Sequence, residues 1–113
     1  MAEVPGEQPI DVAHLRLYTA GDAGLEKEIA VLFEESCTTY LAGLRGAAND
    51  HDWRQAAHAL KGAARGVGAF ALGALAEKAE AMLGPRAGER PAIVGAIADS
   101  AATAMIFMKD LTK

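Results

Sequence analysis

The chain has 113 residues, which fits a single domain that is large enough to bury a hydrophobic core. Hydrophobic residues make up 51% of it and aromatic residues only 5%, and its richness in alanine favours closely packed helices. The net charge of −4 argues against a general binder of nucleic acid or of membrane surfaces. The single cysteine, Cys37, excludes an intrachain disulfide and suits a buried structural thiol in a reducing compartment.

Residues 1–9 are predicted to form a flexible lead-in, and residues 10–113 a single helical domain. The lead-in contains prolines and acidic residues and lacks an apolar core, so it is no signal peptide. No apolar run approaches the ~20 residues that a membrane-spanning helix needs. We therefore expect a soluble cytoplasmic protein.

The spacing of apolar side chains predicts helices only, because no segment shows the alternation that is typical of strands. Asp11 and Asp22 are expected to cap the first two helices, and Asp50 or Asp52 the third. The turn Gly84-Pro85 ends the fourth helix. The expected helices are 12–19, 23–48, 53–67, 70–83 and 91–111.

Each helix carries an apolar stripe with three- and four-residue steps. Outside the third helix, the residues expected to point inward are Leu15 and Tyr18; then Leu25, Ile29, Leu32, Phe33, Ser36, Tyr40, Leu44 and Ala47; then Leu72, Leu75, Ala76, Ala79 and Leu83; and finally Ile93, Ile97, Ala101, Ala104, Met108 and Leu111. Four long helices with short connections predict an all-α, antiparallel up-down four-helix bundle, with the short first helix capping one end. Four stripes suffice to close one core, so we expect a monomer.

The third helix separates its residue types by face. Its apolar side consists of Trp53, Ala57, Leu60, Ala64 and Val67. At about 100° per residue, His58 falls about 140° from Trp53, on the polar side. Three cations, Arg54, Lys61 and Arg65, lie within about 60° of His58, so we expect the histidine to stand among three cations and no carboxylate.

This pattern suits a histidine that carries a phosphoryl group. Neutral imidazole is a competent nucleophile, and its attack on phosphorus gives a phosphoramidate whose added negative charge needs nearby donors. Lys61 lies one turn from His58 and can reach the phosphoryl oxygens, while Arg54 and Arg65 extend the positive field. Gly62 costs the helix about 1 kcal/mol relative to alanine. We interpret it as clearance that lets a partner approach His58.

The segment Ala57–Ala69, A-H-A-L-K-G-A-A-R-G-V-G-A, resembles the signature of histidine-containing phosphotransfer (HPt) domains, H-x-L-K-G-x-x-x-x-x-G. The run G-D-A-G-L-E-K-E-I-A-V-L-F-E-E-S before it and the run L-x-x-L-A-E-K-A-E after it are similar to the flanking helices of this family. The resemblance therefore covers most of the chain. The positions that match the signature are His58, Leu60, Lys61, Gly62 and Gly68.

The resemblance implies a four-helix bundle with an exposed phosphoacceptor, His58, which takes a phosphoryl group from a receiver-domain aspartate and passes it to another receiver. Lys61 is then the charge partner of the phosphoryl group, Gly62 the clearance residue, and Gly68 the residue that permits a close turn. The partner supplies the aspartate, the Mg²⁺ and most of the catalytic machinery. The chain itself is thus expected to be a phosphocarrier and no enzyme, with no cofactor and no metal site.

The expected partners are response-regulator receiver domains, with a hybrid histidine kinase as a further candidate. The partner-binding residues are expected to be His51, Arg54, Ala59 and Arg65. His51 and His58 are two turns apart, too far for ordinary metal chelation.

Three residues depart from the HPt pattern. Ala63 and Ala64 stand where many members have small hydroxyl residues, and Gly66 where many have a polar one. These changes put the rate of transfer in question more than the function. Two other functions fit the sequence: a non-catalytic helical adaptor, and the phosphoacceptor domain of a chemotaxis-type kinase.

Overall fold

The computed structural model describes residues 8–113, and residues 1–7 of the predicted lead-in lie outside this range. The described part is all helical, as the sequence predicts, and contains no strand. Its elements are α1 (Val12–Thr19), α2 (Ala23–Arg45), α3 (Asp50–Val67), α4 (Phe70–Glu80), a 3₁₀ helix η1 (Gly84–Glu89) and α5 (Arg90–Leu111). Both α2 and α4 end three residues earlier than predicted, and η1 replaces an expected turn.

Side-chain caps fix where the first three helices begin. Asp11 and Asp22 cap α1 and α2 as predicted, since their carboxylates accept hydrogen bonds from the backbone three residues on. The predicted cap of α3 is wrong by one residue or more: the side chain of Asn49 accepts the bond from Asp52 N, at 2.8 Å. Asp50 and Asp52 instead lie in the first turn, where carboxylates favour the positive end of the helix dipole.

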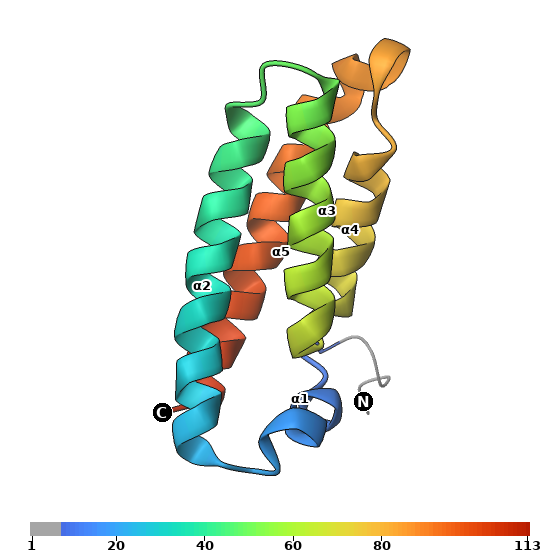
Figure 1. Cartoon of the computed structure of the whole chain (residues 1–113). Coiled ribbons are helices and arrows are strands. Elements are labelled where there is room, and N and C mark those ends of the chain that lie inside the picture. Colours follow the sequence, from blue (N-terminus) through green and yellow to red (C-terminus); the bar gives the residue numbers. More distant parts are fainter. Residues whose placement is uncertain (1–7) are drawn as a thin grey trace.

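The four longer helices lie side by side, and successive helices run in opposite directions (Figure 1). Contacts between helices join α3 to both α2 and α4, and join α5 to the same two helices, so these four surround one core. The short α1 lies across the end of the molecule where α3 meets α4 (Figure 1). A buried carboxylate ties it down, because Thr19 Oγ1 donates to Glu26 Oε2 at 2.7 Å.

The core contains the predicted inward residues of α3 and most of those of α5. Cys37 is buried, as expected, and burial followed by the nearby Glu34 carboxylate raises the pKa of its thiol to about 11. The core residues are Ile10, Leu15, Phe33, Cys37, Leu44, Trp53, Ala57, Leu60, Ala64, Val67, Ala69, Leu72, Ala76, Ala79, Met82, Ile93, Ile97, Ala101, Ala104 and Met108.

Three residues predicted to point inward are exposed instead. Tyr18 is 66% exposed, Leu32 is 60% exposed, and Leu25 also lies at the surface. Three- and four-residue spacing leaves two neighbouring columns of α2 apolar, and it does not show which column meets the other helices. The column that contains Phe33 is the buried one.

Within Gly84–Leu111, a window of 18 residues is apolar enough to cross a membrane by length and composition alone, with a mean hydropathy of 1.6. The expectation that no run approaches this length is therefore wrong. The core helix of a soluble bundle has the same composition. Ile93, Ile97 and Met108 of this stretch are buried in the bundle, and 28% of the apolar window as a whole is buried.

Gly68 makes the turn between α3 and α4 possible. It adopts φ +87°, the left-handed conformation that side chains disfavour, and its carbonyl accepts a 2.9 Å hydrogen bond from Asp11 N. A Cβ atom here would lie 2.8 Å from Asp11 O, which is backbone and has little freedom to retreat. The turn and the start of α1 can therefore approach this closely only with a glycine at position 68.

We expect Gly68→Ala to lower the free energy of unfolding by roughly 2–3 kcal/mol, because it combines a left-handed alanine with a backbone clash. Gly66→Ala is the matched control, since a Cβ at this exposed helical position has open space around it. It should instead stabilise the protein by up to about 1 kcal/mol. Denaturant unfolding of both variants measures the difference, and equal effects would refute this account of Gly68.

Candidate functional site

His58 lies on the outer face of α3, opposite the buried residues of the same helix. Its side chain is 70% exposed, whereas Trp53, Ala57 and Leu60 are buried. The amphipathic pattern of the sequence therefore places the imidazole correctly. The contacts of the imidazole with other helices come from the structure alone.

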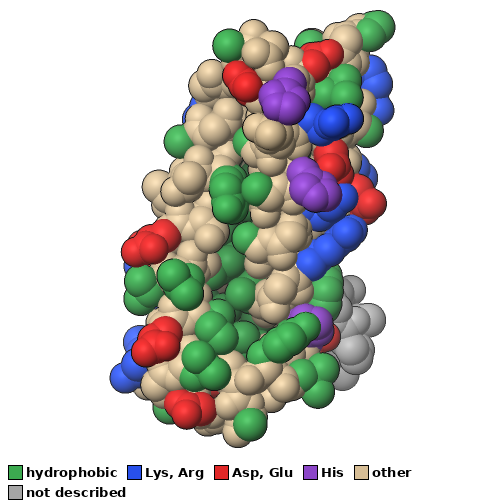
Figure 2. All heavy atoms as spheres, in the orientation of Figure 1, with side chains coloured by type: hydrophobic (Ala, Val, Ile, Leu, Met, Phe, Trp, Pro, Cys, Tyr) green, Lys and Arg blue, Asp and Glu red, His purple; other side chains and the backbone are tan. Residues whose placement is uncertain are grey.

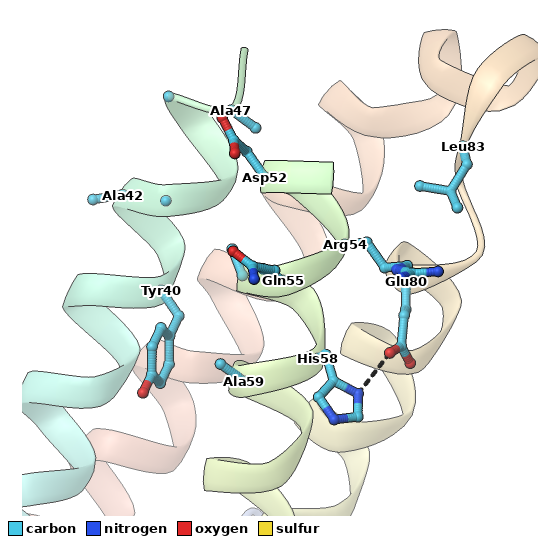
Figure 3. Close-up of a pocket in the computed structure, with 13 residues that line it drawn as sticks. Tyr40, Ala42, Ala47, Asp52, Arg54, Gln55, His58, Ala59, Glu80 and Leu83 are labelled. Atoms are coloured by element: carbon cyan, nitrogen blue, oxygen red, sulfur yellow. Dashed lines mark hydrogen bonds and ion pairs between the residues drawn. The ribbon is translucent and has the colours of Figure 1, made fainter. Parts of the chain in front are cut away.

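A carboxylate from α4 contacts both His58 and Lys61. Glu80 Oε2 lies 2.7 Å from His58 Nδ1, and Glu80 Oε1 accepts a 2.6 Å hydrogen bond from Lys61 Nζ (Figure 3 shows the contact with His58). The prediction that no carboxylate accompanies the cations is therefore wrong. It considered α3 alone, and Glu80 reaches the histidine from the next helix.

The position of Glu80 follows from the tight turn between the two helices. Antiparallel helices that are joined by a short turn bring together residues at similar distances from it. His58 is ten residues before Gly68, and Glu80 is eleven residues after Ala69. This count is the signal by which the sequence alone could have identified Glu80.

The neighbours of Glu80 keep its carboxylate ionised. The hydrogen bond from Lys61 is the main cause that lowers the pKa of Glu80 below its ordinary value, and the bond with His58 lowers it further against the opposing effect of burial. An ionised carboxylate only accepts hydrogen bonds, so the 2.7 Å contact assigns the ring hydrogen of neutral His58 to Nδ1. The other nitrogen, Nε2, then carries a free lone pair on the side of the ring away from Glu80 (Figure 3).

Only one of the three predicted cations around His58 lacks an ion pair. Lys61 pairs with Glu80, and Arg65 Nη2 lies 2.8 Å from Glu77 Oε2. Within residues 8–113, Arg54 has neither an ion pair nor a hydrogen bond with another side chain. The predicted cationic strip is thus an alternation of charges between α3 and α4, which Figure 2 shows as blue and red side chains beside the histidines.

Gly62 leaves a bare surface one turn beyond His58. It is exposed, and a Cβ built on it would have no neighbour within 4 Å. No packing requirement therefore explains this glycine. The small residues Ala59 and Ala63 beside it are half-buried, so the surface around the ring stays low.

A groove of about 1240 Å³ lies beside His58. Small residues of α2 and α3 line it, and at one point the helices approach so closely that a Cβ on Gly43 would lie 3.2 Å from Ala56 Cβ. Tyr40 and Leu83 contribute larger apolar surface (Figure 3). Sequence reasoning missed this groove, although small residues at the end of α2 and directly after it are a signal for it: Ala42, Gly43, Gly46 and Ala47.

The groove brings some of the predicted site residues together and leaves others outside. Arg54, His58 and Ala59 line it, together with the polar side chains of Asp52 and Gln55. The remaining predicted residues do not line it: His51, Lys61, Gly62 and Arg65. His51 is exposed in the first turn of α3, seven residues before His58.

The part of the chain that the structure describes contains no group of three His, Cys, Asp or Glu side chains arranged to hold a metal ion. His58 has a single acidic neighbour, Glu80, and that carboxylate is shared with Lys61. The arrangement is that of an oriented nucleophile at an open surface.

Comparison with known proteins gives one match. The sequence profile of the Hpt domain family matches residues 28–110, whereas no curated protein and no solved structure matches the chain. The matched range comprises 83 of the 113 residues and includes all of α3 and α4 and all of α5 except its last residue. Domains of this family are helical phosphocarriers that interact with receiver domains of response regulators, and they are generally soluble and cytoplasmic. With its all-helical fold and a histidine exposed beside a Lys-Gly pair, the chain belongs to the Hpt domain family, the histidine phosphotransfer domains of two-component phosphorelays.

Proposed function

We propose that His58 is the phosphoacceptor of this domain and that its Nε2 takes a phosphoryl group from the aspartate of one receiver domain and passes it to another. One observation carries the proposal: the ring is exposed, and Glu80 holds its Nδ1 so that Nε2 faces outward with a free lone pair. An exposed nucleophile suits a carrier, because two different proteins must reach the same nitrogen in turn.

Uptake requires no proton to leave the ring. The Nε2 lone pair attacks the phosphorus of the aspartyl phosphate, an N–P bond forms, and the P–O bond breaks so that aspartate leaves as a carboxylate. The ring then carries the phosphoryl group on Nε2 and the hydrogen on Nδ1. This form has a positive charge on the ring, and the Glu80 carboxylate at 2.7 Å stabilises it.

The return step uses the same contact. A carboxylate oxygen of the next receiver attacks the phosphorus, the N–P bond breaks, and its electron pair returns to Nε2. The hydrogen stays on Nδ1, where it is bonded to the Glu80 carboxylate. The leaving group is therefore neutral imidazole. An imidazolate would be a far stronger base and a poorer leaving group. Glu80 therefore favours transfer in both directions, and the receivers determine the net direction.

Lys61 has two roles in this proposal. Its ammonium group holds Glu80 ionised, and it has two further N–H donors besides the one that Glu80 accepts. Those donors are available to phosphoryl oxygens one turn away. The hydrogen bond that His58 Nδ1 donates to Glu80 also orients the imidazole, so the absence of hydroxyl residues at Ala63 and Ala64 does not leave the ring without a hydrogen-bond partner.

The partner-binding face comprises the groove and the bare surface around His58. Arg54, which has no ion pair within residues 8–113, suits an acidic receiver surface, while Ala59 and the small residues of the groove allow close contact. His51 and Arg65 lie at its margin. We take α2–α5 as an antiparallel four-helix bundle that forms a single domain over residues 10–113 and acts as a monomer, with a hybrid histidine kinase as a further candidate partner.

Replacement of His58 by Ala or Gln should abolish phosphoryl uptake and leave the helical content unchanged, because the ring is exposed and contributes little to the core. The wild-type chain, incubated with phosphorylated receivers, should gain one phosphoryl group in intact-mass measurements at neutral or basic pH. His14→Ala, which replaces a histidine of the short helix α1, is the control and should take up phosphate normally. An acid-labile phosphate on the His58→Gln variant would contradict the assignment, and no uptake by the wild type from any receiver of a broad panel would favour an adaptor.

Glu80→Gln should slow both uptake and return about tenfold, because a neutral amide replaces a charge-assisted bond that solvent partly screens. Glu77→Gln is the matched control on the same helix, since it removes the partner of Arg65 and leaves His58 untouched. Rates measured at pH 8 with one receiver decide the matter. Equal rates for the two variants would show that the Glu80 contact is irrelevant to transfer.

Gly62→Ala should separate stability from function. The added methyl group has open space around it, so the variant should be more stable by up to about 1 kcal/mol. The same group narrows the approach to His58, and uptake should fall. Gly66→Ala provides the control, with a similar gain in stability and unchanged uptake. If both variants transfer at the wild-type rate, clearance is not the role of Gly62.

A further inference from the structure

The end of α4 is held from both sides of Glu80. Trp53 belongs to α3, and its side chain is almost fully buried in the core. Its Nε1 donates a 2.7 Å hydrogen bond to Ala79 O. Arg90, at the start of α5, donates from Nε to Met82 O at 2.9 Å. The backbone one residue before Glu80 and the backbone two residues after it are therefore both bound to side chains of neighbouring helices.

The groups that hold this segment also hold one another. The Arg90 guanidinium lies 4.6 Å from the centre of the Trp53 ring, and its Nη2 donates to Asp50 Oδ1 at 2.7 Å. The other oxygen of Asp50 accepts a 2.9 Å bond from Gly84 N. The hydrogen bond from Arg90 is the main cause that lowers the pKa of Asp50, and the bond from Gly84 adds to it. We call Asp50, Trp53 and Arg90 the α4 clamp.

The end of α4 lacks the left-handed cap that closes α3. In α3 the C-terminal residue is followed by Gly68 in the left-handed conformation, which closes the helix. In α4 the C-cap is Ala81 at φ −85°, with no left-handed residue. Backbone amides of Ala81 and Met82 donate to the last carbonyl groups of this helix. The clamp adds side-chain donors to Ala79 O and Met82 O, which further restrain the helix end.

We propose that the α4 clamp is a positioning device for His58: it fixes the backbone on both sides of Glu80, so that the carboxylate meets Nδ1 and leaves Nε2 as the nucleophile. The inference rests on the function proposed above. Its physical reason is that Glu80 has a flexible side chain, whose own partners, His58 and Lys61, are themselves side chains with rotational freedom. A fixed backbone reduces the number of positions that the carboxylate samples.

Trp53→Phe and Arg90→Gln test the clamp. Trp53→Phe keeps an aromatic ring in the core and removes the donor to Ala79 O. Arg90→Gln removes the guanidinium that lies over the Trp53 ring and donates to Met82 O. The ring nitrogens of His58 are observed by ¹⁵N NMR on the unphosphorylated protein at pH 9, where free imidazole is neutral. We expect hydrogen on Nδ1 in the wild type, and a mixture with hydrogen on Nε2 in both variants, as in Glu80→Gln. Uptake from a receiver should fall about threefold.

Ile97→Val is the control, because it disturbs the core on α5 away from the end of α4 and lowers thermal stability without touching the clamp. It should keep the wild-type ring spectrum and uptake rate. The proposal is overturned if Trp53→Phe and Arg90→Gln lower the melting temperature yet keep the wild-type spectrum and rate. The spectrum needs no receiver, so a wild type that takes up no phosphate would refute the proposed function while the spectra still decide the role of the clamp.

Discussion

The packing of α3 against α4 across the tight turn at Gly68 is the constraint on which the site depends. That turn requires a left-handed residue whose Cα faces the backbone of Asp11, so α1 is fixed by the same contact. Once the two helices are joined so closely, the register between them is set. It places Glu80 against His58 and Lys61, and Glu77 against Arg65. The chemistry at the surface is thus a consequence of backbone geometry at the far end of both helices.

A carrier histidine must be both a nucleophile and a leaving group, and one neighbour satisfies both demands. In the proposed function of His58, an ionised carboxylate holds the hydrogen on Nδ1, so the ring would offer a lone pair on Nε2 before transfer and would leave as neutral imidazole after it. The site needs no enclosed cavity for this. Exposure is required instead, because the donor and the acceptor of the phosphoryl group approach the same nitrogen.

The distribution of charge around His58 differs from that of a simple phosphate-binding surface. Two of its cations are paired with carboxylates of α4, and Arg54 is the one without an ion pair within residues 8–113. A strongly positive cage would retain the phosphoryl group, whereas paired charges hold it loosely. Gly62 also lowers the stability of the helix, although packing does not require a glycine at this position.

The sequence by itself determined the helices, the inward face of α3, the exposure of His58 and the family, because each of these depends on neighbours along one helix. Residues at three- and four-residue steps share a face whatever surrounds them. The sequence-based prediction of inward residues failed for Leu32 and Tyr18. Two faces of their helices are apolar, and only the packing of other helices selects the buried one. The ion pair of Arg65 and the α4 clamp were decided by the tertiary structure alone. Glu80 could be identified by counting from the turn at Gly68, but its contacts with His58 and Lys61 depend on how the two helices pack. Contacts between side chains on different helices depend on register and separation, which no single helix encodes.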